Sequence, residues 1–98
     1  MHRLTVQYFD PADGPSFEAE YRERHVPLVR AVPGLERFTL TRPQGGDGTP
    51  YLVADLWFTD DAVLKAALGS PEMAAAGADA ETYDVAHRTM FSGAVDEV

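Results

Sequence analysis

The run from Phe17 to Leu28 constrains the fold of this chain more than any other feature. Its aromatic and apolar side chains recur at the 3.6-residue period of a helix and form one stripe: Phe17, Tyr21, His25 and Leu28. Pro27 lies within the run, and a proline inside a helix costs roughly 3 kcal/mol because it removes a backbone donor and clashes with the preceding turn. A disturbed helix that carries a titratable side chain is a candidate functional site.

Strand-like and helix-like segments alternate along the chain. Strand-like patterns predict four strands, at residues 3–9, 35–42, 51–58 and 84–92. The helical period predicts one helix over residues 16–31, bent at Pro27 because a proline pushes the preceding Val26 away from helical geometry. A second helix is expected over residues 61–80, broken at Gly69 and restarted at Ser70 and Pro71.

The resulting order is β-α-β-β-α-β, which defines the ferredoxin-like α+β unit. In that unit a four-stranded antiparallel sheet carries both helices on one face. The chain has 98 residues, which is the size of one domain, and we expect residues 1–98 to form a single one. A chain this short buries only about 60–68% of its unfolded surface, so a second copy would add to a modest core.

The third predicted strand distinguishes the two faces of the sheet. One face is wholly apolar and suits the helices; it consists of Leu52, Ala54, Leu56 and Phe58. The other face is amphipathic and consists of Tyr51, Val53, Asp55 and Trp57. Its expected companions on the other strands are Thr5, Gln7, Phe9, Arg37, Thr39, Thr41, His87, Thr89 and Phe91, and a slip of one residue would exchange the faces. This mixture of aromatic and polar groups suits a ligand cavity better than a dry core.

The charge balance excludes several kinds of partner. Sixteen acidic and eight basic residues give a formal net charge of -8, so no basic stripe exists for nucleic acid or for an anionic membrane surface. The absence of cysteine excludes disulfides, zinc–thiolate sites and thiol catalysis. No apolar run approaches the roughly 20 residues that span a bilayer, and no signal peptide is visible at the strand-like N-terminus. A cytoplasmic location is the default expectation.

His25 is the first candidate for a chemical role. An unperturbed histidine has a pKa of about 6.5 and can act as a general acid or base near neutral pH. The alternative is a histidine that bonds a backbone carbonyl freed by Pro27, such as that of Glu23. The residues alone leave both readings open.

Asp55 and His87 are the other candidate catalytic residues. A carboxylate within an otherwise apolar strand is costly to bury unless it is paired. Asp55 could orient a histidine or act as a base with a raised pKa; the alternative is an ion pair with Arg37 or Arg88, or exposure at a dimer edge. His87 could face the cavity or occupy a half-exposed strand position.

Several residues of the same neighbourhood are candidates for substrate binding. They are Tyr21, Tyr51 and Trp57, with Gln7 and Thr39 on the amphipathic face. The three aromatic residues could equally form plain core or interface. No metal and no cofactor are expected, because no histidine pair has i,i+2 or i,i+4 spacing and the Gly45–Gly48 segment does not follow the strand-to-helix pattern of a phosphate loop.

The chain resembles the EthD family, small proteins of the dimeric α+β barrel superfamily, over nearly its whole length. The motifs that carry the resemblance are the Phe17–Leu28 run, in which His25 occupies a His-x-Pro motif, Pro33-Gly34-Leu35 and Ser70-Pro71-Glu72. The chain departs from common family members at residues 10–15, where many have a basic residue, and at Tyr21, where tryptophan is frequent.

The resemblance implies a homodimer in which two sheets face each other as a barrel-like enclosure. It also implies a small-molecule cavity on each protomer, between the sheet and the helices or within the barrel. It implies cofactor-free chemistry on a small hydrophobic, cyclic or aromatic, oxygenated compound in a catabolic or secondary-metabolite pathway. His25 would then shuttle a proton while Asp55 or His87 polarises or orients, in an isomerisation, cyclisation, dehydration or cofactor-free oxidation. The alternatives are a non-catalytic binding or accessory protein for an oxygenase system and a structural dimer without a cavity.

Overall fold

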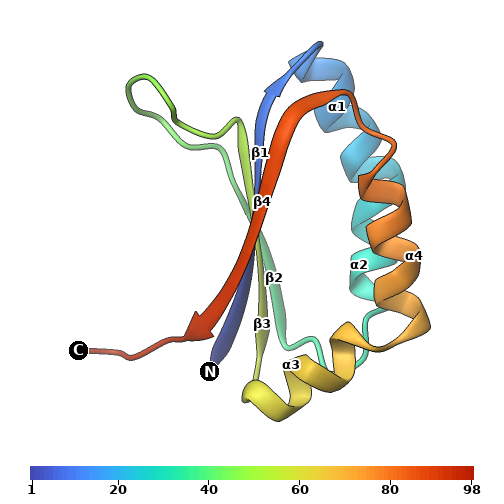
Figure 1. Ribbon diagram of the computed structural model, residues 1–98, viewed down its shortest axis with the longest axis vertical. Helices are drawn as coiled ribbons and strands as arrows, with labels where there is room; N and C mark the ends of the chain where they lie inside the picture. The colour runs from blue at the N-terminus through green and yellow to red at the C-terminus, as the bar shows by residue number, and fades with distance from the viewer.

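The computed structural model describes residues 1–98, and its elements follow the predicted order (Figure 1). They are β1 (His2–Pro11), α1 (Gly14–Glu20), η1 (Tyr21–His25), α2 (Val26–Arg30), β2 (Arg37–Thr41), β3 (Leu52–Phe58), α3 (Asp61–Leu68), α4 (Pro71–Ala80) and β4 (Val85–Ala94). The four strands form one antiparallel sheet in the order β2-β3-β1-β4. This topology confirms the predicted ferredoxin-like α+β fold.

The register of the sheet agrees with the predicted faces of the strands. Asp55 of β3 lies opposite Thr5 of β1 and opposite Thr39 of β2. Phe91 of β4 also lies opposite Thr5. Directly opposed residues share one face of a sheet, so these amphipathic positions lie together. Figure 1 shows the helices on the other face and no element over this one, which we call the outer face.

The face toward the helices forms the core. Its β3 residues Leu52, Ala54, Leu56 and Phe58 are each at most 4% exposed, as the alternation predicts. One buried cluster surrounds Leu56 and Phe58 and includes residues of α3 and α4; a second, aromatic cluster surrounds Tyr8 and Phe17. Full burial of one such large side chain stabilises the fold by roughly 1.5–3 kcal/mol, and the two clusters together hold the helices on the sheet.

The first helical segment differs from the single bent helix that was predicted. A π-helical turn over Tyr21–His25 separates α1 from α2, and the Val26 N–H bonds to the Tyr21 carbonyl. Val26 keeps helical dihedral angles, with φ of -55° and ψ of -47°. The expectation that Pro27 displaces Val26 from helical geometry is therefore wrong. The wider π-helical turn before Pro27 accommodates the missing N–H and the bulk of the proline ring instead. Such π-turns occur frequently at functional sites.

The second helical region breaks where the sequence predicts. α3 ends at Gly69, and Ser70 begins α4 by accepting a hydrogen bond from the Met73 N–H at 3.1 Å. Asp60 caps α3 in the same way, accepting from the Val63 N–H at 2.9 Å. None of the helices is long and apolar enough to cross a membrane.

Gly34, in the turn before β2, packs closely against Val63 of α3, and a substitution there tests this contact. Its φ is 79°, and a Cβ atom there would lie 2.5 Å from Cγ1 of Val63. Gly34→Ala is expected to lower the free energy of unfolding by about 2–4 kcal/mol, because the left-handed conformation costs roughly 1–2 kcal/mol and the overlap adds to it. Urea denaturation measures the loss.

Two other glycines supply matched controls. Gly48 has φ of 86° and open space around it, so Gly48→Ala is expected to lose only the conformational part of about 1–2 kcal/mol. Gly46 also faces open space and lacks a positive φ, so Gly46→Ala should stay within about 0.5 kcal/mol of the parent. Equal losses at Gly34 and Gly48 would contradict the steric role of Val63.

Candidate active site

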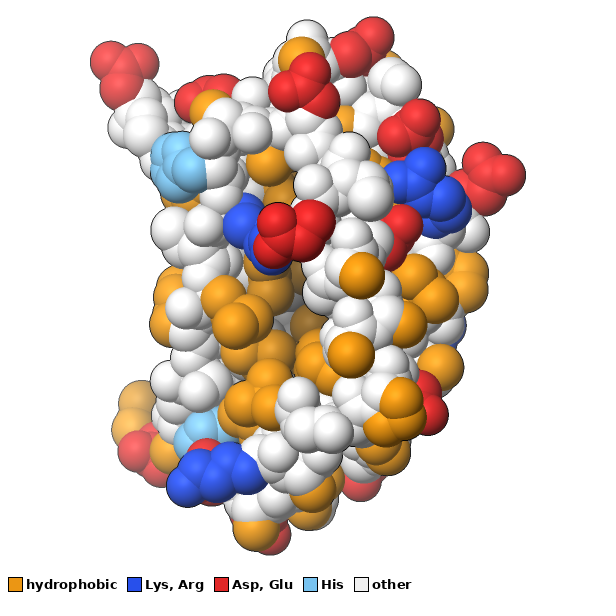
Figure 2. Space-filling view, turned by 45° about the vertical axis from the view of Figure 1, so that its right-hand side comes forward, with side chains coloured by type: hydrophobic (Ala, Val, Ile, Leu, Met, Phe, Trp, Pro, Cys, Tyr) orange, Lys and Arg blue, Asp and Glu red, His pale blue; other side chains and the backbone are white.

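A hydrophobic cleft of about 80 Å³ opens between the sheet and the helices. The sheet contributes Leu4, Val6, Tyr8, Ala54, Leu56, Arg88 and Met90, and the helical layer contributes Tyr21, His25, Val29, Met73, Ala76, Gly77 and Ala80. Figure 2 shows a hollow lined by hydrophobic side chains between two walls of the molecule. The lining holds two basic residues, His25 and Arg88, and no carboxylate. An apolar cleft with a few convergent polar groups is the usual form of a small-molecule site.

A larger but shallower hollow, of about 530 Å³, lies against the loop between β2 and β3. Its cationic residue, Arg42, is already paired with both carboxylate oxygens of Glu18. The structure contains no group of three or more His, Cys, Asp or Glu residues that could hold a metal ion. We therefore place the candidate active site in the smaller cleft, where titratable and hydrophobic groups converge.

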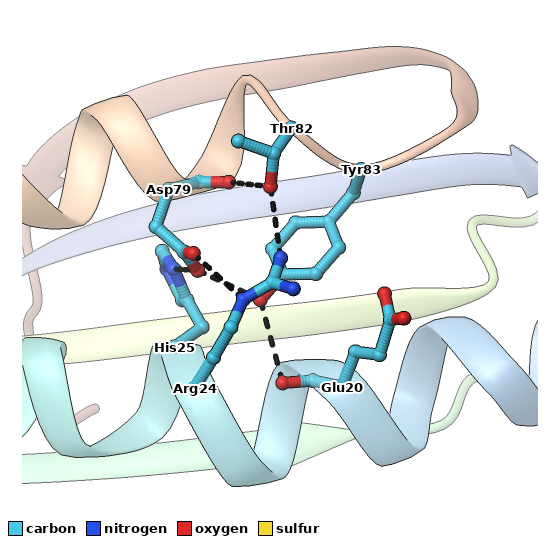
Figure 3. Close-up of polar contacts among 6 residues, drawn as sticks. All are labelled: Glu20, Arg24, His25, Asp79, Thr82 and Tyr83. Atoms are coloured by element: carbon cyan, nitrogen blue, oxygen red, sulfur yellow. Dashed lines mark hydrogen bonds and ion pairs between the residues drawn. The ribbon is translucent and has the colours of Figure 1, made fainter.

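His25 joins this cleft to α4. Its side chain is 7% exposed, and its Nδ1 lies 3.0 Å from Oδ2 of Asp79, in the last turn of α4 (Figure 3). The partner of His25 is therefore a carboxylate, and not a backbone carbonyl such as that of Glu23. Four-residue spacing places Tyr21 and His25 side by side, with ring centroids 4.7 Å apart. The stripe that buries the helix thus also directs His25 towards α4.

Two further donors hold the Asp79 carboxylate. The Tyr83 hydroxyl donates to Oδ2 at 2.7 Å, and Arg24 Nε donates to Oδ1 at 3.0 Å. Arg24 also donates to Oγ1 of Thr82 at 2.9 Å, and its guanidinium lies 5.0 Å from the centroid of the Tyr83 ring. Figure 3 shows these side chains converging on Asp79 from η1 and from the segment that ends α4. A polar network with all its members paired rigidifies its surroundings, so the position of His25 is well defined.

This environment determines the charges of the pair. Burial acts to raise the pKa of Asp79, but hydrogen bonds from Tyr83, His25 and Arg24 outweigh it and hold this pKa below its ordinary value. Burial also lowers the pKa of His25 below its ordinary value of 6.5, against the opposing effect of Asp79. Near neutral pH the pair therefore consists of a carboxylate and a neutral imidazole.

The pairing selects one tautomer of His25. Because Asp79 is ionised and can only accept, Nδ1 carries the proton and donates it, which leaves the lone pair on Nε2. No group of the protein bonds Nε2, and the His25 side chain lines the cleft. A neutral imidazole oriented by a carboxylate, with its second nitrogen free, is the arrangement of a general base.

Two tyrosine hydroxyls accompany this base. Tyr8 and Tyr21 both line the cleft, and their rings meet edge to face with centroids 5.5 Å apart. Burial raises the pKa of Tyr8 to about 12, and burial likewise raises the pKa of Tyr21. Both phenols keep their protons at neutral pH, and their hydroxyls interact with each other. As a pair they can donate a hydrogen bond to an oxygen atom of a ligand.

The structure separates the residues predicted to act together. His25 and Tyr21 line the cleft, whereas Asp55 and His87 occupy the outer face of the sheet. The sheet therefore lies between His25 and both of its predicted helpers, and the expectation that Asp55 or His87 orients His25 is wrong. Asp79 occupies that position instead.

Asp55 is paired within its own face. It accepts a hydrogen bond from Oγ1 of Thr5 at 2.5 Å, and Nε of Arg3 lies 3.6 Å from the same carboxylate oxygen. The expected structural partners, Arg37 and Arg88, do not pair with it; Arg88 extends from the helix-facing side of β4. The carboxylate within the apolar strand is thus compensated locally, as burial requires.

The other polar candidates on the outer face also have neighbours there. The His87 ring stacks on Phe9 with centroids 4.3 Å apart, and the Thr89 hydroxyl donates to Oε1 of Gln7 at 3.0 Å. Thr39 shares this face by its register with Asp55. These residues form a partly exposed polar surface and do not line the cleft.

The two remaining aromatic candidates differ in position. Trp57 lies on the outer face between Arg3 and Arg37, whose guanidinium carbons are 5.4 and 5.5 Å from its ring, and its Nε1 is buried without a partner. Tyr51 was predicted for the same face, but it precedes β3 and its ring packs edge to face on Phe17, 6.1 Å away. The prediction that Tyr51 lies on the outer face is therefore wrong. Tyr51 lies outside β3, so the alternation of side chains along that strand does not determine its direction.

Sequence reasoning missed Asp79, Tyr83 and Arg24. One signal for Asp79 is present, because it is the single charged residue in the alanine-rich segment 73–80. The four-residue spacing of Asp79 and Tyr83 is a second signal, weaker because many such pairs occur by chance. Nothing in the sequence connects these residues with His25, 54 positions earlier, because only the packing of α4 on η1 brings them together.

The fold and the cleft define a class of small α+β proteins with a histidine-containing cleft beneath a ferredoxin-like sheet. A family model described as antibiotic biosynthesis monooxygenase (ABM) matches residues 4–79 of this chain. The chain therefore belongs to the antibiotic biosynthesis monooxygenase family. It is also 37% identical, over 94 residues, to an uncharacterized 11.0 kDa protein in the thcB-thcC intergenic region of Rhodococcus erythropolis, a match that covers 93% of this chain and 91% of that protein.

Solved structures share the fold over nearly the whole chain. An ethyl tert-butyl ether d (EthD) family protein of Bacillus halodurans is 29% identical with a TM-score of 0.89, covering 98% of this chain and 99% of the other. SnoaB of Streptomyces nogalater, described as a cofactor-independent oxygenase, is 19% identical with a TM-score of 0.69, covering 99% and 94%. The first likeness agrees with the resemblance to EthD proteins; the second shows the fold alone.

The buried His25 makes stability depend on pH. Because the folded pKa lies below the ordinary value of 6.5, the unfolded chain binds more protons in the interval between them, and the free energy of unfolding falls as the pH is lowered through that interval. His25→Gln is expected to weaken this acid-side decline. Urea denaturation between about pH 5 and 8 measures it.

His87→Gln is the matched control, because this histidine is exposed on the outer face. It should retain the decline of the parent protein. A histidine titration by NMR gives an independent check, in which the pKa of His25 lies below 6.5 and falls further in Asp79→Asn, since Asp79 acts to raise it. A parent protein whose His25 titrates above 6.5 would refute the assignment of a buried neutral imidazole.

Proposed function

We propose that this protein is an enzyme that removes a proton from a small hydrophobic, oxygenated compound, cyclic or aromatic, bound in the cleft. The observation that carries the proposal is the His25–Asp79 pair, whose free Nε2 belongs to a side chain that lines the cleft. The hydrophobic lining would hold the carbon skeleton, and the Tyr8 and Tyr21 hydroxyls would bind its oxygen atoms. All the groups that this chemistry needs are supplied by the chain itself.

The proposed step is a general-base reaction. Nε2 of His25 takes a proton from an acidic C–H or O–H group of the substrate, and Asp79 stabilises the imidazolium that forms through the bond to Nδ1. The electron pair remains on the substrate as an enolate or phenolate. Hydrogen bonds from the tyrosine hydroxyls would stabilise this negative charge. Because the charge develops during the reaction, these bonds favour the transition state over the bound substrate.

Two outcomes of that anion agree with reactions that the resemblance to EthD proteins implies. Return of the proton from His25 to another atom of the substrate completes an isomerisation with no change in oxidation state. Reaction of the anion with dioxygen is the alternative, and it is suggested by the family description and by the cofactor-independent oxygenase that shares the fold. In a balanced form, a methylene group and one dioxygen molecule give a carbonyl group and one water molecule.

The likeness to the Bacillus halodurans structure supports a closer placement. At 29% identity and a TM-score of 0.89, we infer that the chain is an EthD-like member of the superfamily. The His-x-Pro motif at His25 and Pro27 would then be the shared site element. A reason for the proline is its place in the first turn of α2, where its missing N–H is tolerated, one residue beyond the π-helical turn that presents His25 to α4.

We also propose that two copies associate through the outer faces of their sheets. This face carries no helix, its residue Phe91 is 51% exposed, and two proteins of this fold are described as dimeric. In such a dimer Asp55, His87 and Trp57 would be interface residues. Gln7 and Thr39 would then bind substrate only if the enclosure between the two sheets also admits it.

Substitution of exposed apolar residues tests the dimer. Phe91→Asp is expected to shift the parent dimer to a monomer at micromolar concentration, because it would bury an unpaired charge between the sheets. Leu68→Asp is the matched control: Leu68 is 44% exposed at the end of α3, away from the outer face, and the dimer should persist. Sedimentation velocity gives the masses, and a monomeric parent protein would overturn the proposal.

Loss of the base tests the catalytic step. A panel of naphthols and cyclic 1,3-diketones is incubated with the protein, and substrate loss and dioxygen consumption are followed by NMR and an oxygen electrode. His25→Gln is expected to reduce kcat by roughly 10²–10⁴-fold, the usual contribution of general-base catalysis. For the parent, kcat/KM should rise with pH through the lowered pKa of His25 and level off near neutral pH.

Companion variants separate the competing assignments. Asp79→Asn should reduce kcat with little change in KM, because it alters the base and leaves the cleft intact; His87→Gln should retain turnover, because its ring lies on the outer face. If the parent binds members of the panel without converting any, a binding or accessory protein for an oxygenase system becomes the better reading. Normal turnover by a folded His25→Gln protein would exclude the proposed mechanism.

A further inference from the structure

Arg88 is the one polar side chain of the cleft that the proposed mechanism does not use. It extends from β4 on the same face as Tyr8, directly opposite that residue in the register, and it lines the cleft together with His25. The remaining lining residues are apolar, aromatic or glycine. The net charge of the protein is -8, yet the one charged side chain that lines the cleft is the cation Arg88, because His25 is neutral.

Most of the hydrogen-bonding capacity of Arg88 is unused within the protein. Its Nη2 donates to Oε1 of Glu81, just beyond α4, at 2.8 Å, and the guanidinium makes no other hydrogen bond to the chain. A guanidinium has five N–H donors in a fork that matches a carboxylate or another oxyanion. Four of these donors are therefore open to solvent or to a ligand.

The Arg88–Glu81 pair bridges the two walls of the cleft weakly. Arg88 belongs to the sheet and Glu81 follows α4, and their side chains are 32% and 72% exposed. An ion pair exposed to this extent contributes only about 0–1 kcal/mol, so exchanging Glu81 for another anion costs little. A carboxylate of a ligand that also fills the apolar cleft would compete favourably for Arg88.

The charge of Arg88 also acts on Tyr8, its neighbour on the sheet, and on His25 on the opposite wall. It acts to lower the raised pKa of Tyr8, whose main cause is burial, and it acts to lower the pKa of His25 after the larger effect of burial. The Asp79 carboxylate does not line the cleft and is bonded by Tyr83, His25 and Arg24. An anionic oxygen between these walls would meet the Arg88 cation and the Tyr8–Tyr21 pair of hydroxyls.

We propose that Arg88 is a specificity residue that selects anionic ligands, so that the cleft takes a hydrophobic compound bearing a carboxylate or another acidic oxygen. Glu81 holds Arg88 across the cleft in the absence of ligand and yields it when the anion arrives. The inference rests on the proposed function for the location of the ligand, and it names the class of compound that the cleft accepts. The apolar part of the ligand would lie along Leu56, Met73 and Ala76.

Benzoate and benzamide are suitable probes, because they have nearly the same shape and differ in charge. Titration into ¹⁵N-labelled protein should perturb the amides of Ala76, Gly77 and Ala80, which line the cleft, and should give a Kd for benzoate about tenfold below that for benzamide. Arg88→Gln should abolish this preference and leave the Kd for benzamide unchanged. Arg88→Lys should retain part of it, because the charge remains but the fork is lost.

Two further variants make the test specific. Glu81→Gln should tighten benzoate binding about two- to fivefold, since it removes the competing carboxylate from Arg88. His25→Gln should keep the preference for benzoate, because the selection depends on Arg88. Thermal unfolding verifies that each variant is folded. Equal affinity for the two probes, no binding of benzoate, or a preference that survives in Arg88→Gln would overturn the proposal.

The outcomes also distinguish this inference from the catalytic one. A benzoate preference in a protein that converts no compound of the panel would support the role of Arg88 and count against catalysis. Turnover of neutral compounds without any benzoate preference would support catalysis and reject the role of Arg88.

Discussion

The candidate site depends on the hydrogen bonds that converge on the Asp79 carboxylate. It accepts hydrogen bonds from Tyr83 and Arg24 and pairs with His25, and so it joins the end of α4 to the π-helical turn. Removing one hydrogen-bonding partner and leaving the other buried group unsatisfied costs about 1–3 kcal/mol. The same carboxylate holds His25 in one tautomer and one orientation, while burial keeps the imidazole neutral. Stability and chemistry are therefore coupled at this residue.

The sheet divides the molecule into two chemical environments. On the helix side, apolar residues of β1 and β3 form a cleft in which a histidine, an arginine and two tyrosines converge. On the outer side, Thr5, Asp55 and Arg3 pair with one another, and Trp57 lies between two arginines. Strand alternation creates this division, because neighbouring side chains of a strand point to opposite faces. Residues close in sequence, such as Asp55 and Leu56, thus belong to separate environments.

The sequence predicts the fold well because its signals are local. The alternation in β3, the cap at Ser70 and the interruption at Gly69 each act within a few residues, and the structure shows each of them. The effect of Pro27 is less predictable, because a helix can respond to a proline by a kink, a break or a wider turn. Here the packing of Tyr21 and His25 beneath α4 accompanies the wider turn.

The candidate site is predictable only in part, and the limit is physical. The sequence by itself determines that His25 lies on the inner stripe of a helix beside a proline, since helical period is a local property. The partner of His25 depends on the packing of α4 against η1, which brings Asp79, 54 positions away in the sequence, to the imidazole. It also depends on the alternation of side chains along the strands, which places Asp55 and His87 on the opposite face of the sheet. Long-range packing specifies these contacts, and no local pattern encodes the distance between two helices. The chain therefore determines its histidine, and the tertiary structure decides which carboxylate makes it a base.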